Sequence, residues 1–211
     1  MIWISCVCII CLCVCLPLFM YYKKSLIPHL ASSFKSLGTL CAFSLALIAA
    51  LRLDPRCFVC TAAILFYAVA DFLLEYYLMP GMGFFMAGHV CSIAFFLSLA
   101  PVSMLHLLCL LFLGGMMAFV YYRWRKPIGK NMAAFSVYGI SLVMMSVCAL
   151  SCFTANGLAG ILIACGGALF YLSDFMLLRR LLFPSARSLS WIIMITYYIS
   201  VLLFGIACLR L

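Results

Sequence analysis

The sequence has few charged residues and no long polar segment. Charged side chains make up 8% of the 211 residues, acidic side chains number only four, and 70% of the residues are hydrophobic. A soluble domain is apolar in about half of its residues and covers its surface with polar ones. This composition therefore excludes a water-soluble fold. No polar segment is long enough to fold separately, and we expect a single transmembrane domain over residues 1–211.

Targeting signals are also missing. The first segment, MIWISCVCIICLCVCLPLFMYY, lacks the positively charged start and the small-residue cleavage site of a signal peptide. It is long enough to span a membrane, so we expect it to remain as the first helix. Lipid-attachment and retention motifs are not found, so we expect the helices themselves to anchor the protein. Short loops without targeting tails are typical of a bacterial inner membrane, where we expect the protein to lie.

Cysteine is abundant, but the spacing of a metal site is missing. The chain has fourteen cysteines, and Cys57 and Cys60 are spaced as CxxC. No second CxxC follows, and no histidine lies at zinc-finger spacing. In apolar helical sequence, cysteine behaves as a small hydrophobic residue. We therefore expect the cysteines to pack or to face lipid, and we expect no metal site.

Eight apolar stretches have about the length of a transmembrane helix. They cover residues 2–22, 34–51, 57–79, 83–99, 102–122, 131–153, 156–178 and 189–209. Prolines support the boundaries, because a missing N–H costs little in a linker; Pro55, Pro80, Pro101, Pro127 and Pro184 all fall between the expected helices. The sequence predicts an all-α polytopic bundle of about eight transmembrane helices.

The basic residues indicate the orientation of this bundle. Eight spans place ten of them at one end, namely Lys23, Lys24, Lys35, Arg123, Arg125, Lys126, Lys130, Arg179, Arg180 and Arg187. Arg52, Arg56 and Arg210 fall at the other end. The positive-inside rule then predicts that the first end faces the cytoplasm and that both termini lie outside. Because the charges are divided among short loops, we expect no nucleic-acid partner.

A few ionisable and phenolic side chains interrupt the apolar spans. Such residues usually face the interior of a bundle or a wet cavity, and they mark functional sites. Counting 1.5 Å per residue from the expected helix ends places six of them about 6–12 Å from the cytoplasmic boundary. These six are Asp71, His89, Tyr138, Asp174, Tyr197 and Tyr198. Their similar depth predicts one polar site in the cytoplasmic half of the bundle.

Two of the acids are close along one helix. Asp71 and Glu75 are four residues apart and share a helix face. Like charges at that spacing repel each other, so we expect one of the two to be protonated and able to act as a general acid. Glu75 lies nearer the boundary, where it could turn toward Lys or Arg instead. A structural role, in which buried acids hold helices together, remains the alternative.

Four short patches of the sequence match motifs that occur together in one family of membrane proteins. Lys35 and Thr39 in FKSLGTL match K-P-L-T-T, and Asp71 with Leu74 matches G-D-x-x-L. GMGFFMAGH matches G-L-x-A-F-x-x-x-H through His89. GGALFYLSDFMLL and TYYIS match G-A-x-x-F-x-x-S-D-x-x-L and T-Y-Y-x-A-Q. In these patches the chain resembles the YhhN-like lysoplasmalogenase family, whose members are eight-helix membrane proteins.

The chain also departs from these motifs. Ser36 stands where the family has Pro, Ala70 replaces Gly, and Ser92 replaces a frequent Tyr. Ser200 and Val201 replace the Ala-Gln of the last motif. Any role of that Gln is therefore missing here or is supplied by another residue.

The resemblance implies an activity and a substrate. Lysoplasmalogenases hydrolyse the vinyl ether bond of lysoplasmalogens, 1-alkenyl-glycerophosphoethanolamine or -choline, to a fatty aldehyde and the glycerophospho head group. The partner is then a lysophospholipid within the membrane. The reaction begins with proton transfer to the β-carbon and passes through an oxocarbenium ion, a cation of the kind that glycosidases handle with two carboxyl groups. This scheme requires no cofactor.

The same resemblance and chemistry assign expected roles to particular residues. We expect Asp71 and Asp174 to be the proton donor and the stabilising carboxylate, in an order that the sequence leaves open. Expected helpers are His89, Tyr197 and Tyr198, which would orient water or the hemiacetal, and Glu75, which would keep Asp71 protonated. Expected substrate-binding residues are Lys35, Thr39, Tyr138, Ser173, Arg179 and Arg180. The basic members lie where a lipid phosphate would lie, although topology and surface anchoring also explain them.

Two other classes of function remain open at this point. A transporter for a small solute or lipid would also place acids and tyrosines at membrane depth. It would be expected to show inverted repeats with broken helices, and no clear internal repeat is found. A noncatalytic lipid-binding or assembly subunit would bind lipid without needing either aspartate.

Overall fold

A computed structural model gives the structure of residues 2–211, and every regular element within these residues is helical. The first rod consists of α1 (Ile2–Ile9), a π-helical segment (Ile10–Cys15) and α2 (Leu16–Lys24). The other α-helices are α3 (Pro28–Arg52), α4 (Cys57–Leu74), α5 (Leu78–Leu99), α6 (Met104–Ile128), α7 (Met132–Ser151), α8 (Gly157–Leu182) and α9 (Arg187–Cys208). Short 3₁₀ turns at Gly129–Asn131 and Cys152–Thr154 follow α6 and α7. The predicted all-α class is confirmed.

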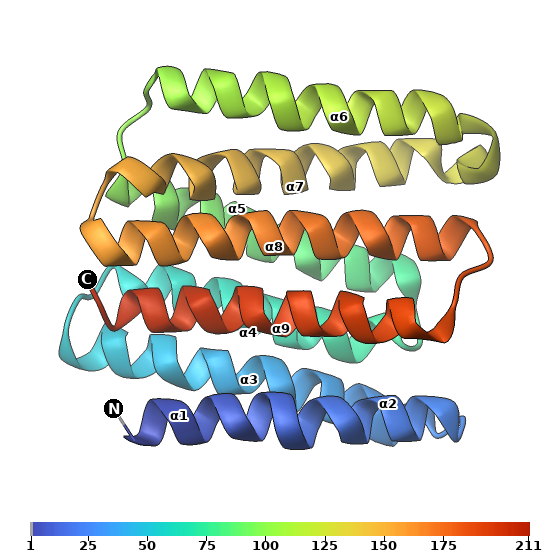
Figure 1. The fold of residues 1–211 in the computed structure, drawn as a ribbon, viewed down its shortest axis with the longest axis horizontal. Helices are drawn as coiled ribbons and strands as arrows, with labels where there is room; N and C mark the ends of the chain where they lie inside the picture. The colour runs from blue at the N-terminus through green and yellow to red at the C-terminus, as the bar shows by residue number, and fades with distance from the viewer. Residues whose placement is uncertain (1) are drawn as a thin grey trace.

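The predicted number of spans is also confirmed. Seven helical stretches of the described residues are long and apolar enough to cross a membrane. One of them, Met104–Thr154, contains both α6 and α7, which run antiparallel as two separate rods (Figure 1). The chain reverses between them at Gly129, whose positive φ of 58° suits glycine. Counted separately, α6 and α7 bring the total to eight rods, and the chain is a multi-pass membrane protein.

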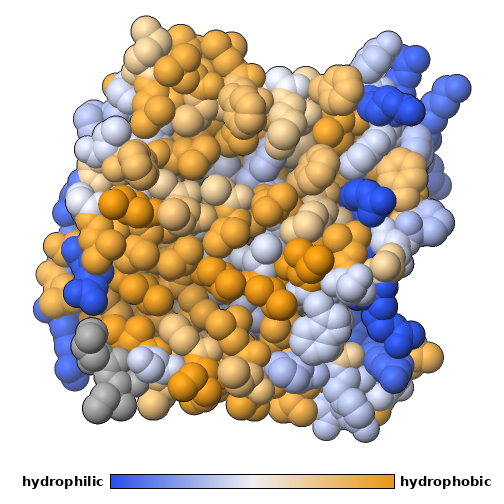
Figure 2. All heavy atoms as spheres, viewed as in Figure 1, coloured by the Kyte–Doolittle hydropathy of each residue, from blue (hydrophilic) through white to orange (hydrophobic). Residues whose placement is uncertain are grey.

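The surface has the distribution of polarity that a membrane requires. An apolar band covers the middle of the viewed face, and hydrophilic side chains gather at its two edges (Figure 2). The α2–α3, α4–α5, α6–α7 and α8–α9 connections lie at one end of the bundle, and the start of α1 and the end of α9 lie at the other (Figure 1). The first of these ends is the one that the basic residues predict to face the cytoplasm. The orientation and the bacterial membrane stay predictions.

Some helix boundaries differ from those expected. Two of the prolines placed in linkers lie inside helices: Pro80 is in the first turn of α5 and Pro127 is in the last turn of α6. A first-turn N–H has no partner within the helix, which is why Pro80 is tolerated there. The helix α3 begins at Pro28, six residues before the expected start, because proline suits the first helical position. Lys35 therefore lies about two turns inside α3 rather than at the start of the helix.

The first rod is not a regular α-helix throughout. Pro17 lacks the N–H that would bond to the carbonyl of Cys13, and a π-helical segment immediately precedes it. After this change of helical register, Phe19 and Lys23 are four residues apart and share a face of α2. Both side chains line the main cavity of the protein. The rod thus contributes to the site as well as to anchoring.

An aromatic cluster packs at the centre of the bundle. Phe170 on α8 is fully buried, with ring centroids 5.1 Å from Tyr67, 5.4 Å from His89 and 5.5 Å from Tyr197. The contacts join α4, α5, α8 and α9, whereas α6 and the first rod lie at the two edges of the bundle (Figure 1). Aromatic pairs at these separations add stability beyond the area that they bury. The cluster fixes the relative positions of the helices that carry the polar residues.

Candidate functional site

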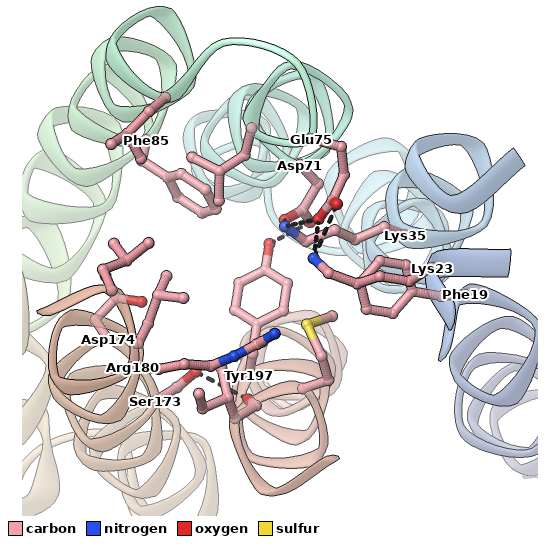
Figure 3. Close-up of a pocket in the computed structure, with 16 residues that line it drawn as sticks. Phe19, Lys23, Lys35, Asp71, Glu75, Phe85, Ser173, Asp174, Arg180 and Tyr197 are labelled. Carbon is pink, nitrogen blue, oxygen red and sulfur yellow. Dashed lines mark hydrogen bonds and ion pairs between the residues drawn. The ribbon is translucent and has the colours of Figure 1, made fainter. Parts of the chain in front are cut away.

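A cavity of about 360 Å³ lies among the ends of α2, α4 and α8 and the start of α5. Its ionisable and hydroxyl side chains are Lys23, Lys35, Asp71, Glu75, Ser173, Asp174, Arg180 and Tyr197. Asp174 lies on one side, the Asp71–Glu75 pair lies on the other, and Arg180 extends between them (Figure 3). Acidic and basic groups from α2, α3, α4 and α8, together with a hydroxyl from α9, thus meet at one end of an otherwise apolar bundle.

Asp71 is held by two hydroxyl groups and one ammonium group. It is fully buried on α4, and its Oδ2 accepts hydrogen bonds from Thr39 Oγ1 at 2.5 Å and from the Tyr197 hydroxyl at 2.7 Å. The Nζ of Lys35 lies 3.4 Å from its Oδ1. Two hydrogen-bond donors on Oδ2 and a cation near Oδ1 favour the charged form of the carboxyl group, whereas complete burial opposes it. Asp71 thus has the cation and hydroxyl donors that stabilise an ionised carboxylate.

Glu75 is paired with two lysines rather than opposed to Asp71 alone. Lys23 Nζ donates to both of its carboxylate oxygens at 2.8 Å, and Lys35 Nζ lies 3.5 Å away. Burial raises the pKa of Glu75, but the charges of Lys35 and Lys23 lower it by more, so its pKa lies below the ordinary value. The repulsion expected from the i,i+4 spacing is therefore offset by Lys35, which lies between the two acids.

Asp174 has a different environment. It lies on α8, it is 8% exposed, and it accepts a hydrogen bond from the Tyr138 hydroxyl. Among the described residues, no Lys or Arg nitrogen lies within 4 Å of its carboxyl group, in contrast to Asp71. With one neutral donor and no paired cation, this carboxyl group is in surroundings that permit the protonated form. The two aspartates thus differ in their partners: Asp71 has a cation and two hydroxyl donors, and Asp174 has one hydroxyl donor and no cation. An acid–carboxylate pair requires such a difference, because one carboxyl group must carry a proton and the other a charge.

Apolar space continues from Asp174 into the bundle. A narrow cavity of about 40 Å³ shares Asp174, Leu74 and Phe85 with the main cavity and reaches Met117 and Gly139. A third cavity of about 350 Å³, formed by α6 and α7, shares Met117 and Gly139 with the narrow one. The shared lining residues place the three spaces next to one another, and we call the narrow cavity together with the groove between α6 and α7 the apolar passage.

Tyr121 stands where the narrow cavity meets the groove. It lines both spaces, and its hydroxyl donates a hydrogen bond to the backbone carbonyl of Phe135. A Cβ at position 139 would overlap this hydroxyl, so glycine is required for the ring to lie there. Tyr121 therefore sets the width of the apolar passage.

Four predicted site residues, Thr39, His89, Arg179 and Tyr198, lie outside all of these cavities. His89 is fully buried, with Nδ1 hydrogen-bonded to Ser141 Oγ at 3.0 Å and its ring against Tyr138. Arg179 is exposed and lies 3.5 Å from Ser185 Oγ. Tyr198 donates to the backbone carbonyl of Lys35 at 2.9 Å. His89 and Tyr198 thus support residues that reach the cavity.

Thr39 and the remaining predicted residues contact the aspartates or the cavity wall. Tyr138 lines the narrow cavity beside Asp174, and Thr39 contacts Asp71. Ser173 lines the main cavity, although its hydroxyl donates to the carbonyl of Ile193 on α9 at 2.9 Å. That bond holds α8 to α9 beside the site.

Asp71 and Tyr197 meet as expected, but their depths counted along single helices are unequal. Helix α4 ends at Leu74, so Asp71 lies only about 4.5 Å from that end, whereas Tyr197 lies about 15 Å from the start of α9. The carboxylate of Asp71 and the hydroxyl of Tyr197 are nevertheless 2.7 Å apart. The helices end at different levels, so equal depth in the bundle does not mean an equal count of residues.

Sequence reasoning missed Lys23 and the apolar wall. Lys23 was counted only as a topology signal, yet it binds Glu75 and lines the cavity. Its spacing of four from Phe19 was the available signal, because both residues then face the same side of a helix. Leu74 was marked only as a motif position, and Leu177 and Gly139 carry no signal that distinguishes them from ordinary core residues.

At two of the positions where the chain departs from the expected motifs, the residues present make local contacts with the neighbouring helices. Ser92, found where a Tyr is frequent, lies 2.9 Å from the Tyr67 hydroxyl on α4. Ser200 donates to the carbonyl of Gly166 at 2.7 Å, and Val201 is fully buried.

Among residues 2–211, no group of three or more His, Cys, Asp or Glu side chains has an arrangement that could hold a metal ion.

The fold and the site together define a polytopic membrane protein with an acid-lined cavity at one end and an apolar passage leading from it. The chain belongs to the YhhN family, whose model matches residues 30–207. The match begins after the first rod, so Phe19 and Lys23 come from outside it. No curated protein and no solved structure matches the chain.

Proposed function

We propose that this protein hydrolyses the vinyl ether bond of lysoplasmalogens, releasing a fatty aldehyde and glycerophosphoethanolamine or glycerophosphocholine. The observation that carries the proposal is the pair of aspartates from α4 and α8, which face one cavity in different surroundings. Membership of the YhhN family supports the same activity. The protein is then a membrane-embedded hydrolase.

Asp174 is the proton donor in this proposal. Its carboxyl group, without a paired cation, gives a proton to the β-carbon of the vinyl ether, and an oxocarbenium ion forms. Water then attacks the adjacent carbon and returns a proton to Asp174, which leaves a hemiacetal. The hemiacetal collapses to aldehyde and alcohol as its hydroxyl proton passes to the departing glycerol oxygen. One water is consumed, and Asp174 ends in its starting state.

Asp71 is the stabilising carboxylate. Thr39, Tyr197 and Lys35 hold it in the charged form, and a fixed negative charge lowers the energy of the oxocarbenium ion. The Tyr197 ring lines the cavity, and its hydroxyl points toward Asp71 (Figure 3). Tyr197 is therefore placed to orient the water that captures the cation.

The shape and charge of the spaces suit a single-chain phospholipid. Arg180 lines the cavity, and among the described residues it has no carboxylate within ion-pair distance, so it is available for a phosphate. Lys35 is 5% exposed and engaged by two carboxylates, so it is assigned to the acids rather than to the head group. The apolar passage beyond Asp174 receives the hydrocarbon chain.

Purified protein reconstituted with lysoplasmenylethanolamine in D₂O tests the proposal. The expected product is fatty aldehyde with one deuterium at C2, because the proton that cleaves the vinyl ether comes from exchangeable solvent through Asp174. Immediate reduction to the alcohol prevents later exchange, and mass spectrometry counts the deuterium. Empty liposomes control for spontaneous hydrolysis. Lipid movement across the vesicle without aldehyde release would refute hydrolysis and favour transport.

The passage past Tyr121 predicts a dependence on chain length. Met117→Trp fills the junction of the narrow cavity and the groove, so long-chain substrates are expected to lose at least about tenfold in kcat/KM while short-chain substrates lose little. Aldehyde release from a series of chain lengths measures the ratio. The matched control is Met116→Trp, on the same helix but 36% exposed and outside the cavities. Equal loss at every chain length would place the chain elsewhere.

A further inference from the structure

The ion pair between Lys23 and Glu75 lies at the mouth of the main cavity. Lys23 Nζ donates to both Glu75 oxygens at 2.8 Å and lies 5.1 Å from the centre of the Phe19 ring. A primary ammonium group is thus held by a carboxylate with an aromatic face beside it. This arrangement is a built site for an ammonium ion, occupied by a side chain of the protein itself.

The two lysines on Glu75 differ in freedom. The Lys23 side chain is 35% exposed, whereas the Lys35 side chain is 7% exposed and also contacts Asp71. Lys23 is near the end of α2, from which its long side chain can turn toward solvent, while Lys35 lies inside α3. Lys23 is therefore the partner that another cation can replace.

We propose that a zwitterionic phosphoethanolamine head group inserts into the Lys23–Glu75 pair, with its ammonium on Glu75 and its phosphate on Lys23 and Arg180. The exchange breaks the Lys23–Glu75 ion pair and makes three new ones, so no charge is left unpaired. It rests on the proposed function only for the identity of the ligand as a lysophospholipid. The ammonium site is selective: an ethanolamine ammonium has N–H donors for both Glu75 oxygens, whereas the quaternary ammonium of choline has none.

The position of this site fits the reaction. Glu75 follows Asp71 by four residues, about 6 Å along the helix axis, and the ethanolamine, phosphate and glycerol units that separate the ammonium from the vinyl ether are long enough to span that turn. With the head group on Glu75, the vinyl ether reaches the level of Asp71, and Asp174 faces it across the cavity (Figure 3). The head group then binds at Glu75, and the reaction takes place one helical turn away at Asp71, on the same side of the cavity.

Binding of saturated 1-alkyl lysophospholipids tests this inference without any hydrolysis, because these ethers have no vinyl bond. Full-length protein in detergent is titrated with the phosphoethanolamine and the phosphocholine forms of one chain length. The wild type is expected to bind the ethanolamine form about tenfold more tightly. Glu75→Gln is expected to remove that preference. Lys23→Met removes a phosphate contact from both forms but also frees Glu75 from its own lysine, so it is expected to weaken the phosphocholine form more than the phosphoethanolamine form. Lys24→Met, an exposed neighbour, is the matched control and should change neither.

The outcomes separate this inference from the proposed function. Equal affinity for the two head groups in the wild type, or a preference that survives in folded Glu75→Gln protein, would overturn the ammonium site even if aldehyde is released. Selective binding that Glu75→Gln removes would support the site even if no aldehyde is found. A thermal unfolding scan of each variant confirms that the protein compared is folded.

Discussion

Replacing Asp174 by Asn is expected to lower kcat for aldehyde release by about 10²–10⁴-fold, the usual contribution of a general acid. The amide has the shape of the carboxyl group and can still accept the hydrogen bond from Tyr138, but it has no acidic proton to transfer. Because the change removes an interaction made in the transition state, KM should change little. Rates of aldehyde formation over a range of substrate concentrations separate the two constants.

Two further variants make this result specific. Asp71→Asn should lower kcat as well, because the oxocarbenium ion loses its fixed counter-charge, but the variant should still deliver one deuterium from D₂O. Asp54→Asn is the matched control, since Asp54 lies in the loop between α3 and α4, where it pairs with Arg56 at 2.7 Å and lines none of the three cavities. Unchanged kcat in Asp174→Asn would remove this residue from the mechanism.

The class of the fold could be predicted because the membrane constrains the sequence strongly. Spans of about 20 apolar residues separated by short loops leave few alternatives to a helical bundle. The boundaries were less certain, because polar ends of helices look like loops: α3 begins at Pro28 and contains Lys35 within its second turn. A buried lysine paired with two acids has the same sequence appearance as a lysine in a basic loop.

The candidate site could be predicted in part for a similar reason. Asp71, Asp174 and Tyr197 stand out because ionisable and phenolic side chains are costly in apolar helices. Their partners depend on which helices are neighbours, and that information is distributed over the whole packing pattern. His89 shows the limit: its sequence position matched the motif, yet the side chain lies behind Tyr138, outside the cavities.

Replacing Lys35 by Met is expected to be strongly destabilising, by about 3–5 kcal/mol, the usual cost of removing one partner from a buried ion pair. Methionine preserves much of the side-chain volume, so the loss comes from charge rather than from a void. Glu75 retains Lys23, but the buried carboxylate of Asp71 is left without a cation. Thermal unfolding in detergent measures the change, with Lys24→Met as the exposed control.

A double-mutant cycle identifies the cause of that loss. Asp71→Asn in the Lys35→Met background removes the unpaired charge, so the double variant should be more stable than Lys35→Met alone although it carries one more substitution. The same double variant should keep the lowered kcat of Asp71→Asn, because neither change restores the stabilising carboxylate. Recovery of stability without recovery of activity would show that Lys35 keeps Asp71 ionised and that the fold tolerates a neutral pair at this position. Strictly additive losses would instead mean that Lys35 stabilises the bundle through its packing on α3, independently of Asp71.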